Sequence, residues 1–152
     1  MQIIKDTREK TPWVFNNKIC GEVISRKLET GDYSIEGMEH LLCIERKKCV
    51  AEVALNVFEP RFKVELERMR KYKYRFMIME FDLDDVRKYP IGSDIPKSKW
   101  ANLKVGAPYI LKFISEMHVH YDVHVIYAGD RDNAIYVATN IMKRVYEKHK
   151  DD

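Results

Sequence analysis

Three short segments of the chain carry side chains that together suit phosphate chemistry. They are Asp6-Thr7-Arg8-Glu9, Gly31-Asp32-Tyr33 and Glu45-Arg46-Lys47. Carboxylates crowded together repel one another unless a cation lies between them, and such hard oxygen ligands suit Mg²⁺ or Mn²⁺. A neighbouring lysine can orient an attacking water or neutralise charge in the transition state. The same residue types also form ordinary surface salt-bridge clusters, so residue types alone leave both interpretations open.

The second and third segments lie on the two arms of a predicted β-hairpin. We expect its turn to pair Ile35 with His40, a register that sets Asp32 opposite Cys43. Because side chains alternate between the two faces of a strand, Asp32 then shares a face with the glutamate and the lysine of the third segment. The hairpin therefore brings two carboxylates and one ammonium together without any long-range assumption.

The rest of the chain predicts an α/β fold, in which a sheet has helices on both sides. Predicted strands cover Gln2–Lys5, Glu22–Leu28 with Tyr33–Ile35 as its continuation, Leu41–Lys47, and two buried strands at Phe76–Phe81 and Val123–Tyr127. Predicted helices cover Cys49–Val57, a segment that starts at Pro60, Ala107–Met117 and Arg131–Lys148. Asp82–Trp100 is expected to be irregular, because it contains two prolines and a glycine.

Charge is unevenly distributed along the chain. Lys and Arg total 27 against 24 Asp and Glu, which gives a net charge of +3. Residues 46–75 contain ten basic and four acidic residues, so this stretch carries +6 and the remainder −3. A local basic stretch favours a polyanionic partner on one face, although a solvated helix with internal ion pairs has the same composition.

Composition and sequence pattern argue against a disordered, a membrane-spanning and a secreted protein. The 152 residues are 45% hydrophobic, which suits one packed domain, and no apolar run approaches the roughly 18 residues that span a bilayer. The N-terminus reads as a strand rather than a secretory signal, and the three cysteines, Cys20, Cys43 and Cys49, lack metal-site spacing. We therefore expect a cytoplasmic protein, of a bacterial cell or a phage-infected host, with free thiols.

Taken in order, the motifs resemble the nuclease domain of the XPF family of structure-specific DNA endonucleases. The matching segments are IIKDTREKTPWVF (Ile3–Phe15), LETGDYSIEG (Leu28–Gly37), CIERKK (Cys43–Lys48), RFKVELERMRKY (Arg61–Tyr72) and VIYAGDRDNAIYVATNIM (Val125–Met142). The opening segment is similar to that of compact stand-alone members from bacteria and phages. The resemblance implies a restriction-endonuclease-like fold, a variant of the PD-(D/E)xK core with a central mixed sheet flanked by helices. It also implies hydrolysis of phosphodiester bonds with Mg²⁺ or Mn²⁺ at branched, flap or single-strand/duplex junction DNA, in repair, recombination or phage DNA processing.

The resemblance also assigns roles to residues of the three segments. Asp32 and Glu45 match metal ligands, and Lys47 matches the catalytic lysine. Asp6 matches an acidic residue at the edge of the site and is counted with the metal ligands. Arg8, Glu9 and Arg46 match supporting positions of the catalytic set, Arg46 through its backbone carbonyl or by ordering its neighbours.

The chain departs from the family pattern in two places. The family usually has Asp four residues after the lysine, where this chain has Ala51 followed by Glu52. Glu52 is a candidate substitute if the helix is shifted. We also expect residues 1–152 to form a single nuclease domain without a helix-hairpin-helix module. Substrate choice would then rest on this domain, on a homodimer formed through the apolar faces of the last two helices, or on a partner such as a helicase or single-strand-binding protein.

Basic and aromatic residues outside the central segments are candidates for DNA contact. They are Arg61, Lys63, Arg70, Lys71, Lys73, Lys97, Lys99 and Trp100. Trp100 either stacks on an unpaired base or anchors its own loop. Two other functions remain open at this stage, a non-catalytic DNA-binding or dimerisation subunit and a general single-strand nuclease.

Overall fold

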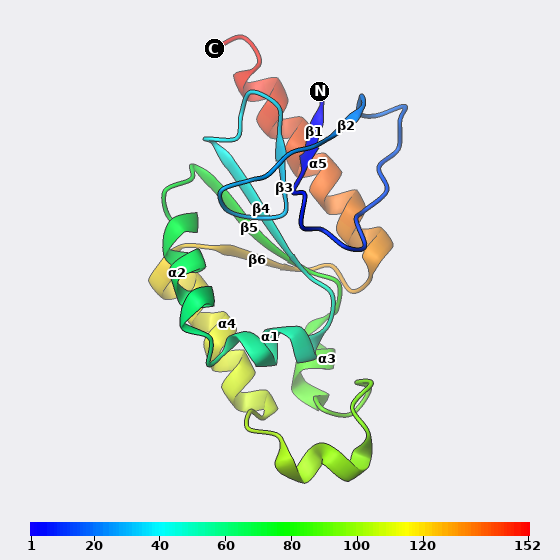
Figure 1. The fold of residues 1–152 in the computed structure, drawn as a ribbon, viewed down its shortest axis with the longest axis vertical. Coiled ribbons are helices and arrows are strands. Elements are labelled where there is room, and N and C mark those ends of the chain that lie inside the picture. The colour runs from blue at the N-terminus through cyan, green and yellow to red at the C-terminus, as the bar shows by residue number, and fades with distance from the viewer.

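A computed structural model describes the whole chain, residues 1–152. Its centre is a six-stranded mixed sheet with the order β2-β1-β3-β4-β5-β6 (Figure 1). The strands are β1 (Ile3–Lys5), β2 (Val23–Ser25), β3 (Tyr33–Ile35), β4 (Leu42–Lys47), β5 (Tyr74–Met79) and β6 (His124–Tyr127). The helices are α1 (Val50–Asn56), α2 (Pro60–Met69), α3 (Leu83–Lys88), the 3-10 helix η1 (Lys97–Asn102), α4 (Ala107–Tyr121) and α5 (Arg131–His149).

Only β3 runs antiparallel to its neighbours, β1 and β4. β1 and β2 are parallel to each other, and β4, β5 and β6 form a parallel half of the sheet. Parallel neighbours need crossover connections, and here α1 and α2 connect β4 to β5 while α3, η1 and α4 lie between β5 and β6. The parallel half is therefore covered by helices, as its strongly apolar strand β5 requires.

Two apolar cores lie on the two faces of the sheet. One core contains residues of α1, α2 and α4 together with Cys43 and Met77. The other contains Ile44, residues of α5 and two aromatic residues of the N-terminal loop, Trp13 and Phe15. Cys43 and Ile44 are adjacent in β4, so the alternation of side chains along this strand divides the two cores.

Several predicted elements need correction. Residues 33–35 are not a continuation of the strand before Gly31, because β2 and β3 lie on opposite sides of β1. The segment expected to be irregular contains α3 and η1, and α3 begins with a capping box in which Asp82 and Asp85 bond each other's backbone amides. β6 was expected to be a buried strand, but it lies at the edge of the sheet and is mostly half-exposed.

The hairpin register also differs from the predicted one. Tyr33 pairs with Ile44, which by extension places Asp32 opposite Glu45 rather than opposite Cys43. The difference is two residues, so every side chain keeps its predicted face. The turn is longer than expected and includes Met38, whose carbonyl accepts hydrogen bonds from the amides of Leu41 and Leu42.

None of the helices combines the length and the apolarity that a membrane crossing requires.

Candidate active site

The structure brings Asp32, Glu45 and Lys47 together on one face of the sheet. β4 is buried along its whole length, and Glu45 and Lys47 are only 8% and 5% exposed. Asp32 comes directly before β3, and its Oδ2 accepts a hydrogen bond of 2.8 Å from the backbone amide of Arg46. This bond fixes the carboxylate of one strand to the backbone of the next.

Three neighbours hold the Lys47 ammonium. Its Nζ lies 3.8 Å from Glu45 Oε1 and 3.7 Å from Glu52 Oε1. It also lies 4.3 Å from the centre of the Phe62 ring, a cation–π contact from α2. The ammonium is therefore positioned beside the carboxylates with few alternative rotamers.

Glu52 contacts Lys47, which the short side chain of Ala51 cannot do. Its Oε1 faces Lys47, and its Oε2 accepts a hydrogen bond of 3.3 Å from the backbone amide of Lys48. Ala51 and Glu52 lie in the first turn of α1, where a negative side chain also interacts favourably with the helix dipole. A longer side chain, one residue later, thus reaches back to the lysine.

The electrostatics of the two carboxylates favour a bound cation. Burial, and then the charge of Glu9, raises the pKa of Asp32 to about 7, although the Arg46 amide and Lys47 oppose the shift. Burial and then the charges of Asp32 and Glu65 raise the pKa of Glu45 well above its ordinary value. Two carboxyl groups that resist ionisation side by side gain free energy when a cation neutralises them.

Glu65 is a site residue that the sequence analysis did not select. It lies on α2, and its charge contributes to the raised pKa of Glu45, so the two side chains are close to each other. A signal for it exists in the sequence. Glu65 falls on the same helix face as the buried residues Phe62, Leu66 and Met69, where a charged residue needs a reason.

The side chain of Arg46 lies on the opposite face of the sheet. Its guanidinium makes ion pairs of 2.9 Å with Glu9 and 2.7 Å with Glu80, and only 2% of this side chain is exposed. This side chain does not reach the face that carries Lys47, and its ion pairs agree with the expected supporting role of ordering neighbours. Arg46 positions the site through its backbone amide and through the network below the sheet.

That network fastens the N-terminal loop to the sheet. The Tyr33 hydroxyl donates to Glu9 and accepts from the Trp13 amide, at 3.0 and 2.7 Å. The Trp13 ring stacks on Tyr33 with centroids 4.7 Å apart, and its indole N–H donates to Glu80 at 3.0 Å. Glu9 is therefore a structural partner of Arg46 and Tyr33 on the face away from Lys47.

Asp6 and Arg8 stabilise the loop that leads to Asp32. Asp6 Oδ1 accepts a bond of 2.8 Å from the Leu28 amide, and Asp6 Oδ2 accepts one of 2.8 Å from Arg8 Nε. Arg8 also donates to the Leu28 carbonyl. Both oxygens of Asp6 are thus engaged within the chain. These contacts give Asp6 a positioning role, and they offer no support for its predicted role as a metal ligand.

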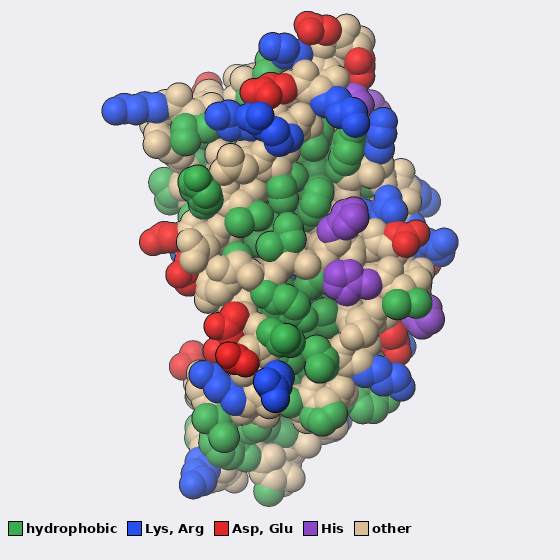
Figure 2. Space-filling view, turned by 180° about the vertical axis from the view of Figure 1, so that it is seen from behind, with side chains coloured by type: hydrophobic (Ala, Val, Ile, Leu, Met, Phe, Trp, Pro, Cys, Tyr) green, Lys and Arg blue, Asp and Glu red, His purple; other side chains and the backbone are tan.

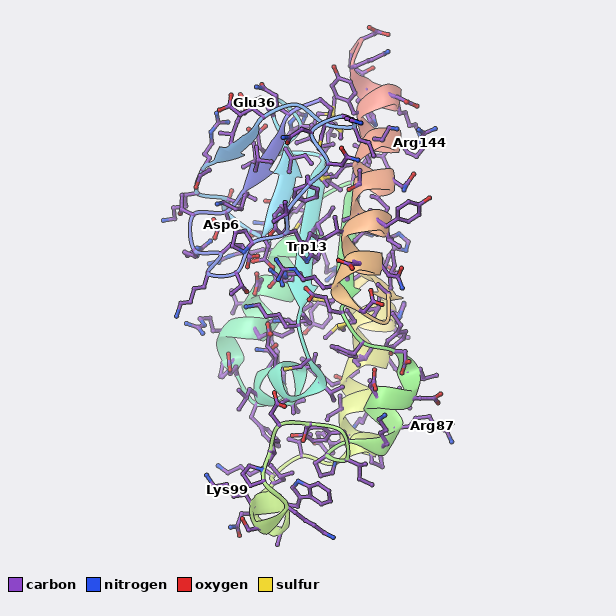
Figure 3. The ribbon with its side chains drawn as sticks, turned by 90° about the vertical axis from the view of Figure 1, so that its right-hand side faces the viewer. Asp6, Trp13, Glu36, Arg87, Lys99 and Arg144 are labelled. Carbon is purple, nitrogen blue, oxygen red and sulfur yellow. The ribbon has the colours of Figure 1, made fainter.

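The residues predicted to contact DNA divide into two groups. Arg61, Lys63, Arg70, Lys71 and Lys73 lie on α2 or directly after it. Lys97, Lys99 and Trp100 lie on η1, and Figure 3 shows Lys99 at the end of the molecule far from Asp6 and Trp13. Trp100 is half-buried and donates from its indole N–H to the Ile95 carbonyl at 3.0 Å, so it anchors its own loop. The structure does not bring this second group to the carboxylates.

The donor set fits a metal that shares its ligands with a substrate. No group of three or more His, Cys, Asp and Glu side chains in this structure is arranged to hold a metal ion. Mg²⁺ bound beside phosphates commonly uses only one or two carboxylates, with waters and phosphate oxygens as its other ligands. The pair of Asp32 and Glu45, whose pKa values are raised chiefly by burial, matches that pattern.

Comparison with known proteins identifies the family. The model of the ERCC4 domain matches residues 5–141. The chain belongs to the ERCC4 domain family. This match covers all three chemical segments, and the ERCC4 domain indicates a family of nucleases. No curated protein matches the chain in sequence.

Solved structures show the fold of this ERCC4 domain. XPF from Aeropyrum pernix is similar with a TM-score of 0.68 and 18% identity, over 99% of this chain and 68% of that chain. The same protein in complex with DNA is similar with a TM-score of 0.65 and 18% identity, over 97% of this chain and 65% of that chain. The chain thus spans about two thirds of the length of these relatives. The ERCC4 domain described here has the restriction-endonuclease-like fold, a mixed sheet flanked by helices.

Proposed function

We propose that this protein is a divalent-metal-dependent DNA endonuclease that acts at branched, flap or single-strand/duplex junction DNA. The observation that carries the proposal is the convergence of Asp32, Glu45 and Lys47 on one face of β3 and β4. Membership of the ERCC4 domain family and the DNA complex of the similar XPF support the choice of a nucleic-acid substrate. Repair, recombination or phage DNA processing are the settings in which such an activity would serve.

Asp32 and Glu45 are the residues that would hold Mg²⁺ or Mn²⁺. When bound, the ion supplies a water of lowered pKa and neutralises charge on the phosphate. The chain itself holds the two carboxylates close together before any ion arrives, because the Arg46 amide orients Asp32 and burial immobilises Glu45.

Lys47 supplies a fixed positive charge at the same face. Glu45, Glu52 and Phe62 hold its ammonium in place, so little reorganisation is needed when negative charge develops on the phosphate. An ammonium held in this way can also donate a hydrogen bond to the attacking water. Lys47 is therefore the side chain whose loss should be most damaging to cleavage without disturbing the fold.

The experiment is cleavage of a panel of flap, fork, nicked, duplex and single-stranded DNA, with Mg²⁺, Mn²⁺ or EDTA. We expect metal-dependent cleavage near junctions, and we expect Lys47→Ala and Asp32→Asn to lower the rate about 10²-fold or more. Arg87→Ala, an exposed residue on α3, serves as the control that cleaves like the parent. Variants that cleave as fast as the parent would disprove the proposed site.

Two other outcomes of the same panel would identify the competing functions. Binding of junction DNA without cleavage under any metal would indicate a non-catalytic DNA-binding or dimerisation subunit, which Ala51 favours as a departure from the family pattern. Equal cleavage of single-stranded and branched DNA would indicate a general single-strand nuclease.

A further inference from the structure

A basic cleft lies beside the carboxylates, between the loop that precedes Asp32 and the end of α2. Its volume is about 480 Å³. One wall is formed by residues 26–30, and the other by Arg68, Lys71 and Tyr72. His40 and Glu39 of the hairpin turn close one side.

Three cations of this cleft have no carboxylate partner. Arg26 is neutralised by ion pairs with Glu36 and Glu39, at 2.6 and 2.9 Å. Lys27, Arg68 and Lys71 are exposed, and none of them forms an ion pair anywhere in the chain. Glu29 is the one acidic residue of the cleft outside these pairs. The free cations therefore leave the cleft with an excess of positive charge that suits an anion.

Both walls of the cleft belong to segments that also carry residues of the candidate active site. The loop wall ends at Thr30, two residues before Asp32. On the helix wall, Arg68 follows Glu65 by three residues, which places it about one turn further along α2 on the same side. A chain of phosphates that passes the carboxylates would meet these cations next.

An unpaired polar atom marks the same place. Thr30 lines the cleft and is only 5% exposed, and its hydroxyl oxygen is buried without a hydrogen-bond partner. Tyr72 lies beside it, but the two hydroxyl groups form no hydrogen bond of acceptable length and angle. Buried hydroxyl groups are normally paired, so the Thr30 hydroxyl keeps unused hydrogen-bonding capacity at this cleft.

We propose that this cleft binds the sugar-phosphate backbone of one unpaired DNA strand, one to three nucleotides from the bond that is cleaved. The inference rests on the proposed function for the position of that bond. A cleft of about this volume has room for one or two nucleotides of a single strand, and its free cations come from both walls that would flank that strand. The cleft therefore selects DNA in which the strand beside the site is single, which is the feature that flaps and junctions share.

The first test measures binding in EDTA, so that it does not depend on cleavage. The variant Lys27→Gln/Arg68→Gln/Lys71→Gln is compared with Lys18→Gln/Arg87→Gln/Lys112→Gln, which removes the same charge from exposed positions outside the cleft. A labelled single-stranded oligonucleotide is titrated at several salt concentrations. The cleft variant should bind about tenfold or more weakly, and its salt slope should fall by about 2, because each phosphate contact on a single strand contributes about 0.7. The control variant should keep the slope of the parent.

The second test locates the strand. Single neutral methylphosphonate linkages are placed at each of the four positions on either side of the cleaved bond. For the parent, neutral linkages at one to three positions on one side should slow cleavage, and for the cleft variant the same linkages should have no additional effect. An equal sensitivity in both proteins would place the strand elsewhere.

The outcomes separate this inference from the proposed function. If the protein binds single strands through the cleft but never cleaves, the proposed function fails and the binding site stands. If the cleft and control variants lose binding equally, or if the salt slope of the cleft variant is unchanged, the inference is wrong. Displacement of the oligonucleotide by inorganic phosphate at equal phosphate concentration would also overturn it, since the cleft would then be a site for a free anion.

Discussion

The side chain of Glu52 determines how this ERCC4 domain keeps its lysine in place. The family position for an aspartate holds Ala51, whose methyl group cannot contact an ammonium. Glu52 instead places Oε1 at 3.7 Å from Lys47 Nζ. The Glu52 side chain is 38% exposed, so its ion pair with Lys47 is partly solvated. Such a pair contributes little to the stability of the fold, and its main effect is to orient the lysine.

We expect Glu52→Ala to slow cleavage about 10- to 100-fold, as is usual when a residue that orients a catalytic group is removed. DNA binding in EDTA should be unchanged, because Glu52 makes no contact that a phosphate would use. The double variant Ala51→Asp/Glu52→Ala restores the family spacing and should recover most of the rate. Failure of the double variant to exceed Glu52→Ala would show that the two positions are not equivalent.

Arg46 illustrates a residue that is essential for a structural reason. Its guanidinium lies between Glu9 and Glu80 in a site with almost no solvent, and it contacts the Trp13 ring face at 5.2 Å. Arg46→Ala leaves two glutamates without their cation, and removal of one partner of a buried ion pair costs about 3–5 kcal/mol. Urea denaturation should show this loss. Arg87→Ala breaks an exposed pair with Asp84 and should cost at most about 1 kcal/mol.

At the scale of elements, α3 is stabilised by its first turn. The Asp85 carboxylate accepts a hydrogen bond of 2.9 Å from the Asp82 amide, and this bond, with a smaller contribution from Lys88, lowers the pKa of Asp85 despite its partial burial. A lowered pKa in the folded state stabilises the protein at pH values above the ordinary value near 3.8. That stabilisation is lost as the pH falls through the lowered pKa.

We therefore expect Asp85→Ala to reduce stability by about 1 kcal/mol between pH 5 and 7, as for the loss of a helix cap. The difference in Tm between variant and parent should narrow below pH 4, where the carboxyl of the parent becomes protonated. Asp151→Ala removes a carboxylate outside the helices and should match the parent at every pH. A difference that stays constant down to pH 2.5 would contradict the assignment.

The elements that the sequence predicts well are those with a strong local pattern. α2 is defined by an apolar stripe of Phe62, Leu66 and Met69 and by the proline before it. The face on which Asp32 lies follows from the alternation of side chains along the hairpin strands. The two-residue register difference was not predictable, because residues 36–41 allow turns of more than one length. Asp82 and Asp85 have the spacing of a capping box, which is a signal for α3. The prolines that follow favour an irregular segment, and this pattern outweighs the short helical signal.

Other features of the site depend on contacts between distant segments. Glu80 follows β5 and meets Arg46 of β4 only because these strands are parallel neighbours. Lys97 and Lys99 are basic and close to an aromatic residue in sequence, but the connection between β5 and β6 carries them to the far end of the molecule. Charge patterns therefore identify candidates, whereas the crossover connections decide which of them reach the carboxylates.

At the scale of the molecule, one edge of the sheet has features of an association surface. β6 is an edge strand with one side unpaired, and α4 and α5 cover opposite faces of the sheet next to it. Ile126 is half-exposed and packs against neither core, while Val119 and Tyr136 are 76% and 71% exposed. Figure 2 shows apolar side chains gathered in a band through the middle of the face seen from behind. Exposed apolar bands of this kind commonly mark protein contacts.

We expect the protein to form a homodimer through this edge, with a mass of about 36 kDa by light scattering, which is twice 18.1 kDa. Ile126→Glu/Tyr136→Glu places charges on β6 and α5 and should shift the protein to the monomer without lowering its Tm by more than a few degrees. Leu55→Glu changes a residue that is as exposed as Tyr136 but lies on α1, and it should remain dimeric. A parent protein that stays monomeric at 100 μM would disprove the dimer. Lys27, Arg68 and Lys71 all come from one molecule. The proposed strand-binding cleft is therefore complete in a monomer, and its function does not depend on the dimer.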